Sequence, residues 1–214
     1  MEMEELIDGV TGVLLAGGRS RRMGRDKRAL ELEGSSLLQR SLSVIGKLFS
    51  EVLVVTAAPE PGIVPPGSRQ VTDLIPNCGS LGGLLTGLSH ASHQRVFVAA
   101  CDMPLLNPDV IRWLCQVDPQ ADVVIANPAQ GIQPMHAVYS KQCLPWLESM
   151  AKEGRLKIQD IVGAQGLTVR VILDDEVRGR DPQGLSFLNV NTPADLEFAR
   201  KLLSARGAGG RSRG

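Results

Sequence analysis

The sequence predicts a three-layer α/β/α sandwich built around a mostly parallel, Rossmann-like sheet. Short apolar runs alternate with segments of helical spacing along the 214-residue chain, a pattern typical of βαβ units. Apolar residues make up 43% of the chain and aromatic residues only 3%, so the core must consist mainly of aliphatic side chains, which suit parallel strands covered on both faces. We expect one domain over residues 1–204 and a disordered, Gly/Arg-rich tail over 205–214.

The first half of the chain alternates regularly between strand and helix. Val10–Ala16 is apolar and leads into two glycines, which indicates a buried strand followed by a loop. Ser36 is suited to cap a helix whose apolar residues recur at helical spacing from Leu37 onwards. The further elements expected in this half are strands at Glu51–Thr56, Gln70–Asp73 and Arg95–Cys101 and a helix at Leu81–Ala91.

The helix expected at Leu81–Ala91 is unusual because it contains three glycines, Gly82, Gly83 and Gly87. A glycine in a helix interior costs about 1 kcal/mol relative to alanine. Several glycines in one helix therefore indicate either close packing against a neighbouring element or a ligand nearby.

The second half of the chain is less regular, but two helix starts are clear. Asn107 followed by Pro108 indicates an N-cap and a first helical position, and Thr192 followed by Pro193 indicates the same for the last helix. The elements expected between them are a helix from Pro108 to Val117, strands at Ala121–Ala126, Met135–Tyr139 and Leu167–Leu173, helices at Gln142–Glu153 and Lys157–Val162, and a brief apolar segment at Phe187–Val190.

The charge balance argues against a general nucleic-acid or membrane-surface binder. Lys plus Arg and Asp plus Glu are equal at 23 each, whereas such binders usually carry a basic excess. Met1–Asp8 lacks the features of a signal peptide, and no apolar stretch is long enough to span a bilayer, so we expect a cytoplasmic protein with no membrane or nucleic-acid partner. The basic residues nevertheless gather within ten positions, at Arg19, Arg21, Arg22, Arg25, Lys27 and Arg28.

This basic cluster belongs to a loop, Leu15–Lys27, that reads L-A-G-G-R-S-R-R-M-G-R-D-K. A strand that leads into a glycine pair lets backbone N–H groups approach phosphate oxygens, and Arg22 and Lys27 add positive charge. The loop contains neither the P-loop pattern nor the dinucleotide fingerprint. Composition alone is equally compatible with a solvated basic loop, but the position directly after an apolar strand favours a triphosphate site.

Two aspartates follow apolar strands. Asp102 ends the run V-F-V-A-A-C-D-M-P and is suited to bind Mg²⁺, which prefers oxygen ligands; alternatively it caps the turn. Asp73 follows a shorter apolar segment and can face the nucleotide or a metal-bound water, or be an ordinary surface or turn aspartate. Because ligands of a parallel sheet bind outside the carboxyl ends of its strands, we expect Asp102 and the basic loop at the same edge.

Other polar residues give weaker signals. Asn189 and Asn191, in N-V-N-T-P, can donate amide hydrogen bonds to a ligand, or Asn191 or Thr192 caps the last helix. We interpret His90 and His93 as exposed residues without a third metal ligand.

Catalytic triads and cysteine-based sites find no support. His136 has no evident Asp or Ser partner in the sequence. The four cysteines form no C-x-x-C pair, which argues against a zinc ribbon or a thioredoxin-like site. Cys101 lies in an apolar run and is expected to be a small buried residue.

Taken together, L-A-G-G-R-S-R-R-M-G-R-D-K, C-D-M-P and N-V-N-T-P-A-D-L resemble the molybdenum cofactor guanylyltransferases, a branch of the nucleotidyltransferases that activate sugars, isoprenoid alcohols and cofactors. The resemblance extends to Leu203. It implies a three-layer α/β sandwich that transfers GMP from GTP to the terminal phosphate of molybdopterin with release of pyrophosphate, with Mg²⁺ as cofactor. GTP and molybdopterin are the implied partners. We further expect a monomer that interacts with molybdopterin-handling enzymes.

The resemblance also implies roles for individual residues. The implied catalytic residues are Arg22, Lys27 and Asp102, of which Asp102 is the magnesium ligand. The implied GTP contacts are Leu15, Ala16, Gly17, Lys27, Val55, Asp73 and Asp102. The implied molybdopterin contacts are Gly82, Asn189 and Asn191.

The chain departs from the family pattern at two positions. Val55 or Thr56 stands where the family often has an asparagine that contacts the guanosine, so the base contact there is reduced to the backbone. The family segment G-P-L-A-G is replaced by G-S-L-G-G at residues 79–83.

Three alternatives stay open at this point. The chain can be a cytidylyltransferase or another nucleotidyltransferase that acts on a different phosphorylated acceptor. A non-catalytic nucleotide-binding or carrier protein is a second alternative, although the presence of both Lys27 and Asp102 argues against it. A basic-loop nucleic-acid module is a third, and it lacks the charge excess and the stacking aromatics.

Overall fold

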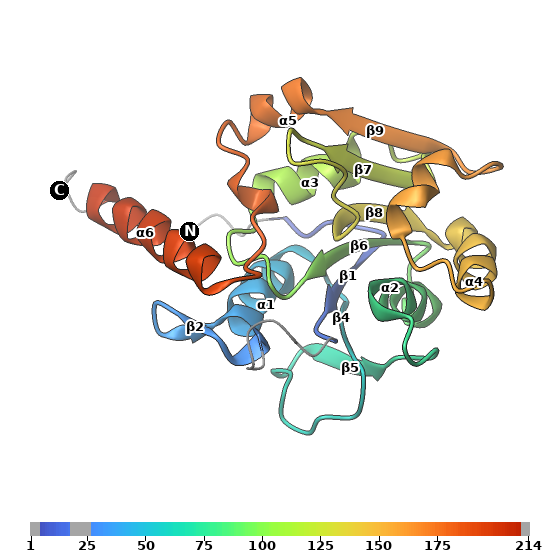
Figure 1. The fold of residues 1–214 in the computed structure, drawn as a ribbon, viewed down its shortest axis with the longest axis horizontal. Helices are drawn as coiled ribbons and strands as arrows, with labels where there is room; N and C mark the ends of the chain where they lie inside the picture. The colour runs from blue at the N-terminus through green and yellow to red at the C-terminus, as the bar shows by residue number, and fades with distance from the viewer. Residues whose placement is uncertain (1–4, 18–26, 211–214) are drawn as a thin grey trace.

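The computed structural model describes residues 5–17 and 27–210, which form a single central sheet with helices on both faces (Figure 1). Strand β8 runs antiparallel to both of its neighbours, and all other neighbouring strands of this sheet are parallel. The predicted mostly parallel sheet is therefore confirmed. In spatial order its strands are β5 (Ser68–Thr72), β4 (Val52–Thr56), β1 (Val10–Leu15), β6 (Arg95–Ala100), β8 (His136–Ser140), β7 (Val123–Asn127) and β9 (Val169–Leu173).

The two faces of the sheet are buried against different helices. Along β1, Val10 and Leu14 pack in one hydrophobic cluster, and Val13 and Leu15 pack in another. The side-chain alternation of a strand sends successive residues to opposite faces, so both sets are buried and the strand reads as continuously apolar. The first cluster includes α1 (Leu37–Leu48) and α3 (Pro108–Gln116), and the second includes α2 (Gly79–His90) and α4 (Leu144–Lys152). This confirms the three-layer sandwich.

The helix starts predicted from the sequence are confirmed. Ser36 Oγ accepts a hydrogen bond from Gln39 N at 3.2 Å, and the Gln39 side chain accepts one from Ser36 N at 3.0 Å, which makes a capping box. Asn107 Oδ1 accepts from Asp109 N at 2.9 Å at the start of α3. Thr192 Oγ1 accepts from Asp195 N at 3.2 Å at the start of α6 (Pro193–Gly210).

Several short elements differ from expectation. The segment expected as a short helix at Lys157–Val162 is the 3₁₀ helix η3 (Ile158–Gly163). The hairpin of β2 (Glu31–Leu32) and β3 (Ser35–Ser36) and the helix α5 (Asp174–Arg180) were not predicted, because strands of two residues and a helix rich in charge show no apolar periodicity. The remaining elements are η1 (Lys27–Ala29), β2 (Glu31–Leu32), β3 (Ser35–Ser36), η2 (Lys141–Cys143), α5 (Asp174–Arg180), η4 (Leu185–Phe187) and α6 (Pro193–Gly210).

Residues after α6 lie outside the described part of the chain. The division into a domain over 1–204 and a disordered tail over 205–214 therefore stays a prediction. Within residues 5–17 and 27–210, no helix combines the length and the apolar character that a bilayer span requires.

The glycines of α2 allow this helix to lie close to β1. A Cβ at Gly87 would lie 2.6 Å from Val13 Cγ1, and a Cβ at Gly83 would lie 3.3 Å from Leu15 Cδ1. Both distances are too short for an ordinary contact between carbons. Close packing therefore explains the two glycines that face the sheet.

We predict that Gly87→Ala lowers the free energy of unfolding, because overpacking costs about 1–3 kcal/mol and outweighs the helix propensity gain of about 1 kcal/mol. The matched control is Gly46→Ala in α1, where an added Cβ meets no atom within 4 Å and where we expect stabilisation of up to about 1 kcal/mol. Urea unfolding of both variants measures the difference. Equal stabilisation by the two substitutions would show that contact with Val13 does not constrain position 87.

A carboxylate ties the strands together at the edge opposite to their carboxyl ends. Glu51, directly before β4, accepts hydrogen bonds from Thr11 Oγ1 at 2.6 Å, from Ser92 N and Oγ at 2.9 Å each, and from Arg69 Nη2 at 3.3 Å. Burial alone would raise the pKa of Glu51, but these hydrogen bonds outweigh it and lower the pKa to about 2. One side chain thus joins β1, β4, β5 and the turn that precedes β6.

The histidines near this carboxylate are less exposed than predicted. His93 is half-buried, and its Nδ1 lies 3.0 Å from Thr11 Oγ1 and 3.9 Å from Glu51 Oε2. His90 is also half-buried, with Nδ1 3.0 Å from the carbonyl oxygen of Thr86. The expectation of exposed histidines was wrong because both rings find local hydrogen-bond partners that the sequence pattern does not reveal.

We predict that Glu51→Gln destabilises the fold at neutral pH, because an amide cannot replace a carboxylate that accepts from several donors at once. Since the folded-state pKa is depressed, the stability contributed by Glu51 is complete above about pH 4.5 and is lost as the pH falls towards about 2. Urea midpoints of both proteins between pH 7 and pH 2.5 should therefore converge at low pH. A difference that stays constant over this range would contradict the prediction.

Candidate functional site

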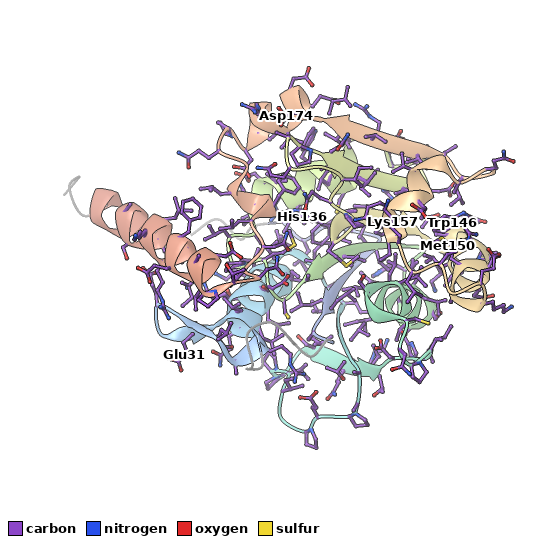
Figure 2. All side chains as sticks on the ribbon, viewed as in Figure 1. Glu31, His136, Trp146, Met150, Lys157 and Asp174 are labelled. Carbon is purple, nitrogen blue, oxygen red and sulfur yellow. The ribbon has the colours of Figure 1, made fainter. Side chains whose placement is uncertain are left out.

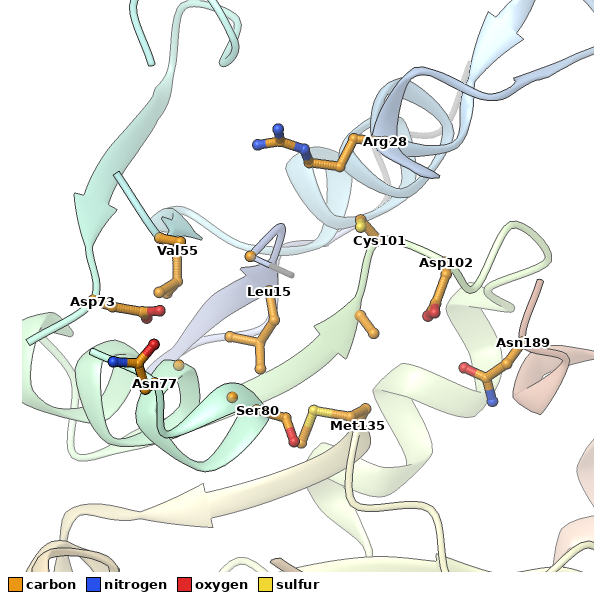
Figure 3. A pocket seen from close by; sticks show the side chains of 15 residues that line it. Leu15, Arg28, Val55, Asp73, Asn77, Ser80, Cys101, Asp102, Met135 and Asn189 are labelled. Atoms are coloured by element: carbon orange, nitrogen blue, oxygen red, sulfur yellow. The ribbon is translucent and has the colours of Figure 1, made fainter. Parts of the chain in front are cut away.

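A cavity of about 510 Å³ lies at the carboxyl ends of the parallel strands (Figure 3). β1 and β6 pair in parallel up to Leu15 and Ala100, and Cys101 N donates a hydrogen bond to Leu15 O at 3.1 Å. The start of the basic loop and the Cys101-Asp102 segment therefore share one edge, as predicted. The residues lining the cavity are Leu15, Gly17, Arg28, Val55, Ala57, Asp73, Asn77, Gly79, Ser80, Gly83, Ala100, Cys101, Asp102, Met135 and Asn189.

Of the three residues predicted as a nucleotide cradle at the end of β1, two line the cavity. These are Leu15 and Gly17. A Cβ at Gly17 would lie 3.5 Å from Ala57 N and 3.8 Å from Asp73 Oδ2, so this glycine keeps the wall open. Ala16 does not line the cavity: it is 1% exposed, packs in the core with α1, and donates its N–H to Val55 O at 2.8 Å. Strand alternation turns its side chain inwards.

The structure distinguishes between the two candidates at the end of β4. Val55 lines the cavity. Thr56 is fully buried, and its hydroxyl donates to Ala58 O at 2.8 Å, so it serves the following turn. At this point the cavity wall is therefore aliphatic.

Of the basic cluster at residues 19–28, one side chain is described, that of Arg28, directly after the basic loop. Arg28 lines the cavity and forms an ion pair with Glu60 at 2.7 Å, with 18% of its side chain exposed. Arg22 lies outside the described residues, and of Lys27 only the backbone, at the start of η1, is described. The catalytic roles of Arg22 and Lys27 stay predictions.

Asp102 lies on the cavity wall directly after β6, and the chain near the C-terminus is joined to it. The backbone oxygen of Asp102 accepts a hydrogen bond from Val190 N at 2.8 Å. This contact brings Asn189 to the same wall, where its Nδ2 donates to Phe187 O at 3.2 Å. Figure 3 shows the Asp102 carboxylate and the Asn189 amide next to each other. Two residues far apart in sequence thus meet at one site.

The donor set around Asp102 fits a magnesium ion that is shared with a substrate. Mg²⁺ is often held by one or two carboxylates, with phosphates and waters as the other ligands. The Asp102 carboxylate and the Asn189 amide supply oxygen atoms at an open cavity. Within residues 5–17 and 27–210, no cluster of three His, Cys, Asp or Glu side chains could hold an ion by protein ligands alone.

Asp73 lies at the other end of the cavity, after β5. Its N–H donates to Thr56 O at 2.9 Å, and the next residue, Leu74, donates its N–H to Thr86 Oγ1 at 3.0 Å. Oδ1 of Asp73 is buried and has no hydrogen-bond partner among the described residues. Burial raises the pKa of this carboxyl group. The turn thus holds a carboxylate with Oδ1 buried and unpartnered and with Oδ2 on the side of Gly17.

Two predicted molybdopterin contacts do not line the cavity. Gly82 faces the other way, since a Cβ there would lie 2.9 Å from Cys78 Cβ and 3.0 Å from Ile75 O, and its neighbour Gly83 lines the cavity instead. Asn191 is exposed, and its N–H donates to Asp195 Oδ2 at 2.9 Å as part of the α6 start. Gly82 is turned away from the cavity by the rotation of the α2 helix. Asn191 is held outside it because its backbone takes part in the start of α6.

Sequence reasoning missed several residues of the cavity wall. Asn77 carries a left-handed backbone with φ of 64°, and the Pro76-Asn77 dipeptide signals a turn but not its orientation. Cys101 is 8% exposed, close to the burial predicted for it, and yet it reaches the cavity. Met135 reaches the cavity from the start of β8, which no local pattern predicts.

His136 takes no part in a catalytic triad. Its ring is fully buried between Phe97 and Phe187, with centroid distances of 5.3 and 4.7 Å, and Figure 2 places it inside the molecule. Burial lowers its pKa to about 3, so the ring is neutral at physiological pH. His136 therefore supports the segment that carries Asn189 by packing.

The family model described as MobA-like NTP transferase domain matches residues 12–169. The chain belongs to this family. It is therefore a nucleotidyltransferase by fold and by sequence, and the matched segment contains the strand ends β1, β4, β5 and β6 that form the cavity.

Relatives within this family are similar over nearly their whole lengths. A probable molybdenum cofactor guanylyltransferase of Pelotomaculum thermopropionicum is 36% identical and covers 89% of this chain and 91% of its own. A molybdenum cofactor guanylyltransferase of Desulfosudis oleivorans is 34% identical, with 93% and 98% covered. The crystal structure of molybdopterin-guanine dinucleotide biosynthesis protein A from Archaeoglobus fulgidus superposes with a TM-score of 0.79 at 26% identity, covering 91% of this chain and 99% of that chain.

We predict that Asp73→Asn increases stability at pH 7, because it removes a charge that burial disfavours. The folded-state pKa is raised above 3.8, so the unfavourable effect of the carboxylate is absent at low pH and grows as the pH rises through the folded-state pKa. Urea midpoints should therefore be higher for the variant at pH 7 and similar for both proteins at about pH 3. A less stable variant at pH 7 would show that Asp73 holds the fold together.

Proposed function

We propose that this chain transfers GMP from GTP to the terminal phosphate of molybdopterin, with release of pyrophosphate, in a reaction that depends on Mg²⁺. The observation that carries the proposal is one cavity at the carboxyl ends of the parallel strands β5, β4, β1 and β6, with Asp73 at one end and Asp102 at the other. The names of the relatives supply the substrate class.

The width of the sheet at this edge suits a nucleoside triphosphate. β5, β4, β1 and β6 are adjacent, and three strand spacings of about 4.8 Å separate β5 from β6 by about 14 Å. An extended nucleotide can therefore place its base near Asp73 and its phosphates near Asp102. Gly17, which has no side chain, lies between these two ends and allows close approach of the backbone.

The protein groups act on the phosphates by position and charge. The attacking phosphate oxygen is already anionic, so no general base is required. It forms a bond to the α-phosphorus of GTP as the bond to pyrophosphate breaks in line, and the site aligns the two substrates. Arg22 and Lys27 are proposed to stabilise the negative charge of the leaving pyrophosphate.

Asp102, assisted by Asn189, would hold Mg²⁺, which when bound neutralises charge on the α-phosphate. Asn189 lines the same cavity as Asp102, which supports the proposal that it contacts molybdopterin. We further propose a cytoplasmic monomer that exchanges molybdopterin with enzymes that handle this cofactor.

We predict that Asp102→Ala reduces guanylyl transfer at least about 100-fold, as expected when electrostatic stabilisation of a transferring group is lost, while the far-UV circular dichroism spectrum is unchanged. Pyrophosphate release from GTP and molybdopterin measures the transfer. The control is Asp109→Ala, an exposed aspartate in the first turn of α3 outside the cavity, which should retain activity. Full activity of the Asp102 variant would refute the proposed metal site.

A further inference from the structure

The basic loop begins and ends at elements that border the cavity. Its start follows β1, where Gly17 lines the cavity, and its end is η1, where Arg28 lines the same cavity. Directly after η1, Leu30 O accepts a hydrogen bond from Leu37 N at 3.0 Å at the start of α1. The end of the loop is thus attached to α1 by the backbone, and the side chain of Arg28 attaches it on the side of the cavity.

Arg28 forms an ion pair with the segment that connects β4 to β5. Its Nη1 donates to Glu60 Oε1 at 2.7 Å, with 18% of the arginine side chain and 37% of the glutamate side chain exposed. Figure 3 shows the Arg28 side chain extending from its backbone towards the side of the cavity where Val55 lies. Neither Arg28 nor Glu60 belongs to the motifs on which the family resemblance rests. The ion pair therefore joins two segments beside the cavity through residues that no motif marks.

The sheet holds the backbone of Glu60 in place. In the orientation that pairs its donor with an acceptor, the Gln70 amide donates to Glu60 O at 3.0 Å and accepts from Glu60 N at 2.8 Å. Gln70 lies in β5, where it pairs with Val54 of β4. Shortly after Glu60, the side chains of Ile63 and Val64 pack against the hydrophobic cluster that also contains α1. Glu60 is therefore fixed relative to the strands that end at the cavity.

Stability alone does not account for this arrangement. An ion pair with a partly exposed carboxylate contributes little to the free energy of unfolding, because solvent screens it and two long side chains lose conformational freedom. Its position in the chain gives it another effect. Lys27 is the first residue of η1 and Arg28 is the next, so the ion pair fixes the backbone from which the Lys27 side chain leaves. A functional side chain keeps its geometry only when the residues around it support it.

Resting on the proposed function, we propose that Glu60 is a positioning residue for nucleotidyl transfer. Through its ion pair with Arg28 it holds η1 at the cavity, and it thereby places Lys27, the residue proposed to stabilise the leaving pyrophosphate. Glu60 itself contacts no substrate, because its carboxylate repels phosphates and is neutralised by the Arg28 guanidinium. The support runs from β5 through Gln70 and Glu60 to η1.

The first test is a comparison of kcat and KM. Negative charge on the leaving pyrophosphate grows as transfer proceeds, so a displaced Lys27 costs more in the transition state than in the GTP complex. We expect Glu60→Gln, which keeps the size of the side chain and removes its charge, to lower kcat about tenfold and to change KM for GTP less than about threefold. The matched control is Glu153→Gln, which breaks the 2.7 Å ion pair with Arg155 away from the cavity and should change neither constant.

Combined substitutions show whether the effect of Glu60 passes through Arg28 and Lys27. Once Lys27 is replaced by alanine, adding Glu60→Gln should lower the single-turnover rate by less than about twofold, because the group that it places is gone. Arg28→Gln removes the other half of the ion pair and should match Glu60→Gln, and the two together should be no slower than either alone. Arg28→Lys keeps a cation opposite Glu60 and should retain most of the rate.

Hydrogen exchange of the full-length protein without substrate tests the support itself. Mass spectrometry should show faster exchange in Glu60→Gln for peptides that cover η1, with unchanged exchange in α3, because only the local contact is lost. Gln70→Ala should give the same local change, since it releases the backbone of Glu60. In the control Glu153→Gln, exchange at η1 should equal that of the wild type.

The outcomes separate this inference from the proposed function. An active wild type with an unchanged kcat or unchanged exchange at η1 in Glu60→Gln would overturn the inference and leave guanylyl transfer intact. Fully additive effects of Glu60→Gln and Lys27→Ala would also overturn it, and so would a larger loss in Arg28→Gln than in Glu60→Gln, which would assign Arg28 to the substrate. A wild type that releases no pyrophosphate from GTP and molybdopterin, or full activity of Lys27→Ala, would instead contradict the function or the role of Lys27 proposed above.

Discussion

The parallel pairing of β1 with β4 on one side and with β6 on the other is the interaction on which the site depends. Each of these strands ends at the same edge of the sheet, and the bond from Cys101 N to Leu15 O continues the pairing past the end of β6. Backbone hydrogen bonds therefore fix the positions from which the loops leave. The cavity, with a carboxylate at each end, follows from this alignment.

The remainder of the fold stabilises this strand alignment, whereas one polar atom at the site has no hydrogen-bond partner among the described residues. The glycines of α2 let the helix pack closely on β1, and Glu51 accepts hydrogen bonds from elements around the opposite edge. At the cavity, by contrast, Asp73 is partly desolvated and has an oxygen without a partner among the described residues. The frame thus offsets the cost of one buried, unpartnered oxygen at the site, which is a common relation between stability and function.

Residues whose role depends on local pattern were predictable. The strand ends that carry Asp73 and Asp102 follow apolar runs, and the caps at Ser36, Asn107 and Thr192 follow from residue type and spacing. Residues whose role depends on orientation were not. Ala16 lies next to two lining residues and yet faces the core.

The sequence by itself determined the layered fold, the order of its main elements and the edge of the sheet at which the cavity lies, because apolar periodicity and strand-terminal polar residues are local properties of the chain. Only the tertiary structure decided which side chains share the cavity. The hydrogen bond from Val190 N to Asp102 O brings Asn189 to the wall that carries Asp102. Gly83 lines the cavity and Gly82 does not, because successive residues of a helix point in different directions. Such choices depend on packing geometry between elements, which no single segment encodes.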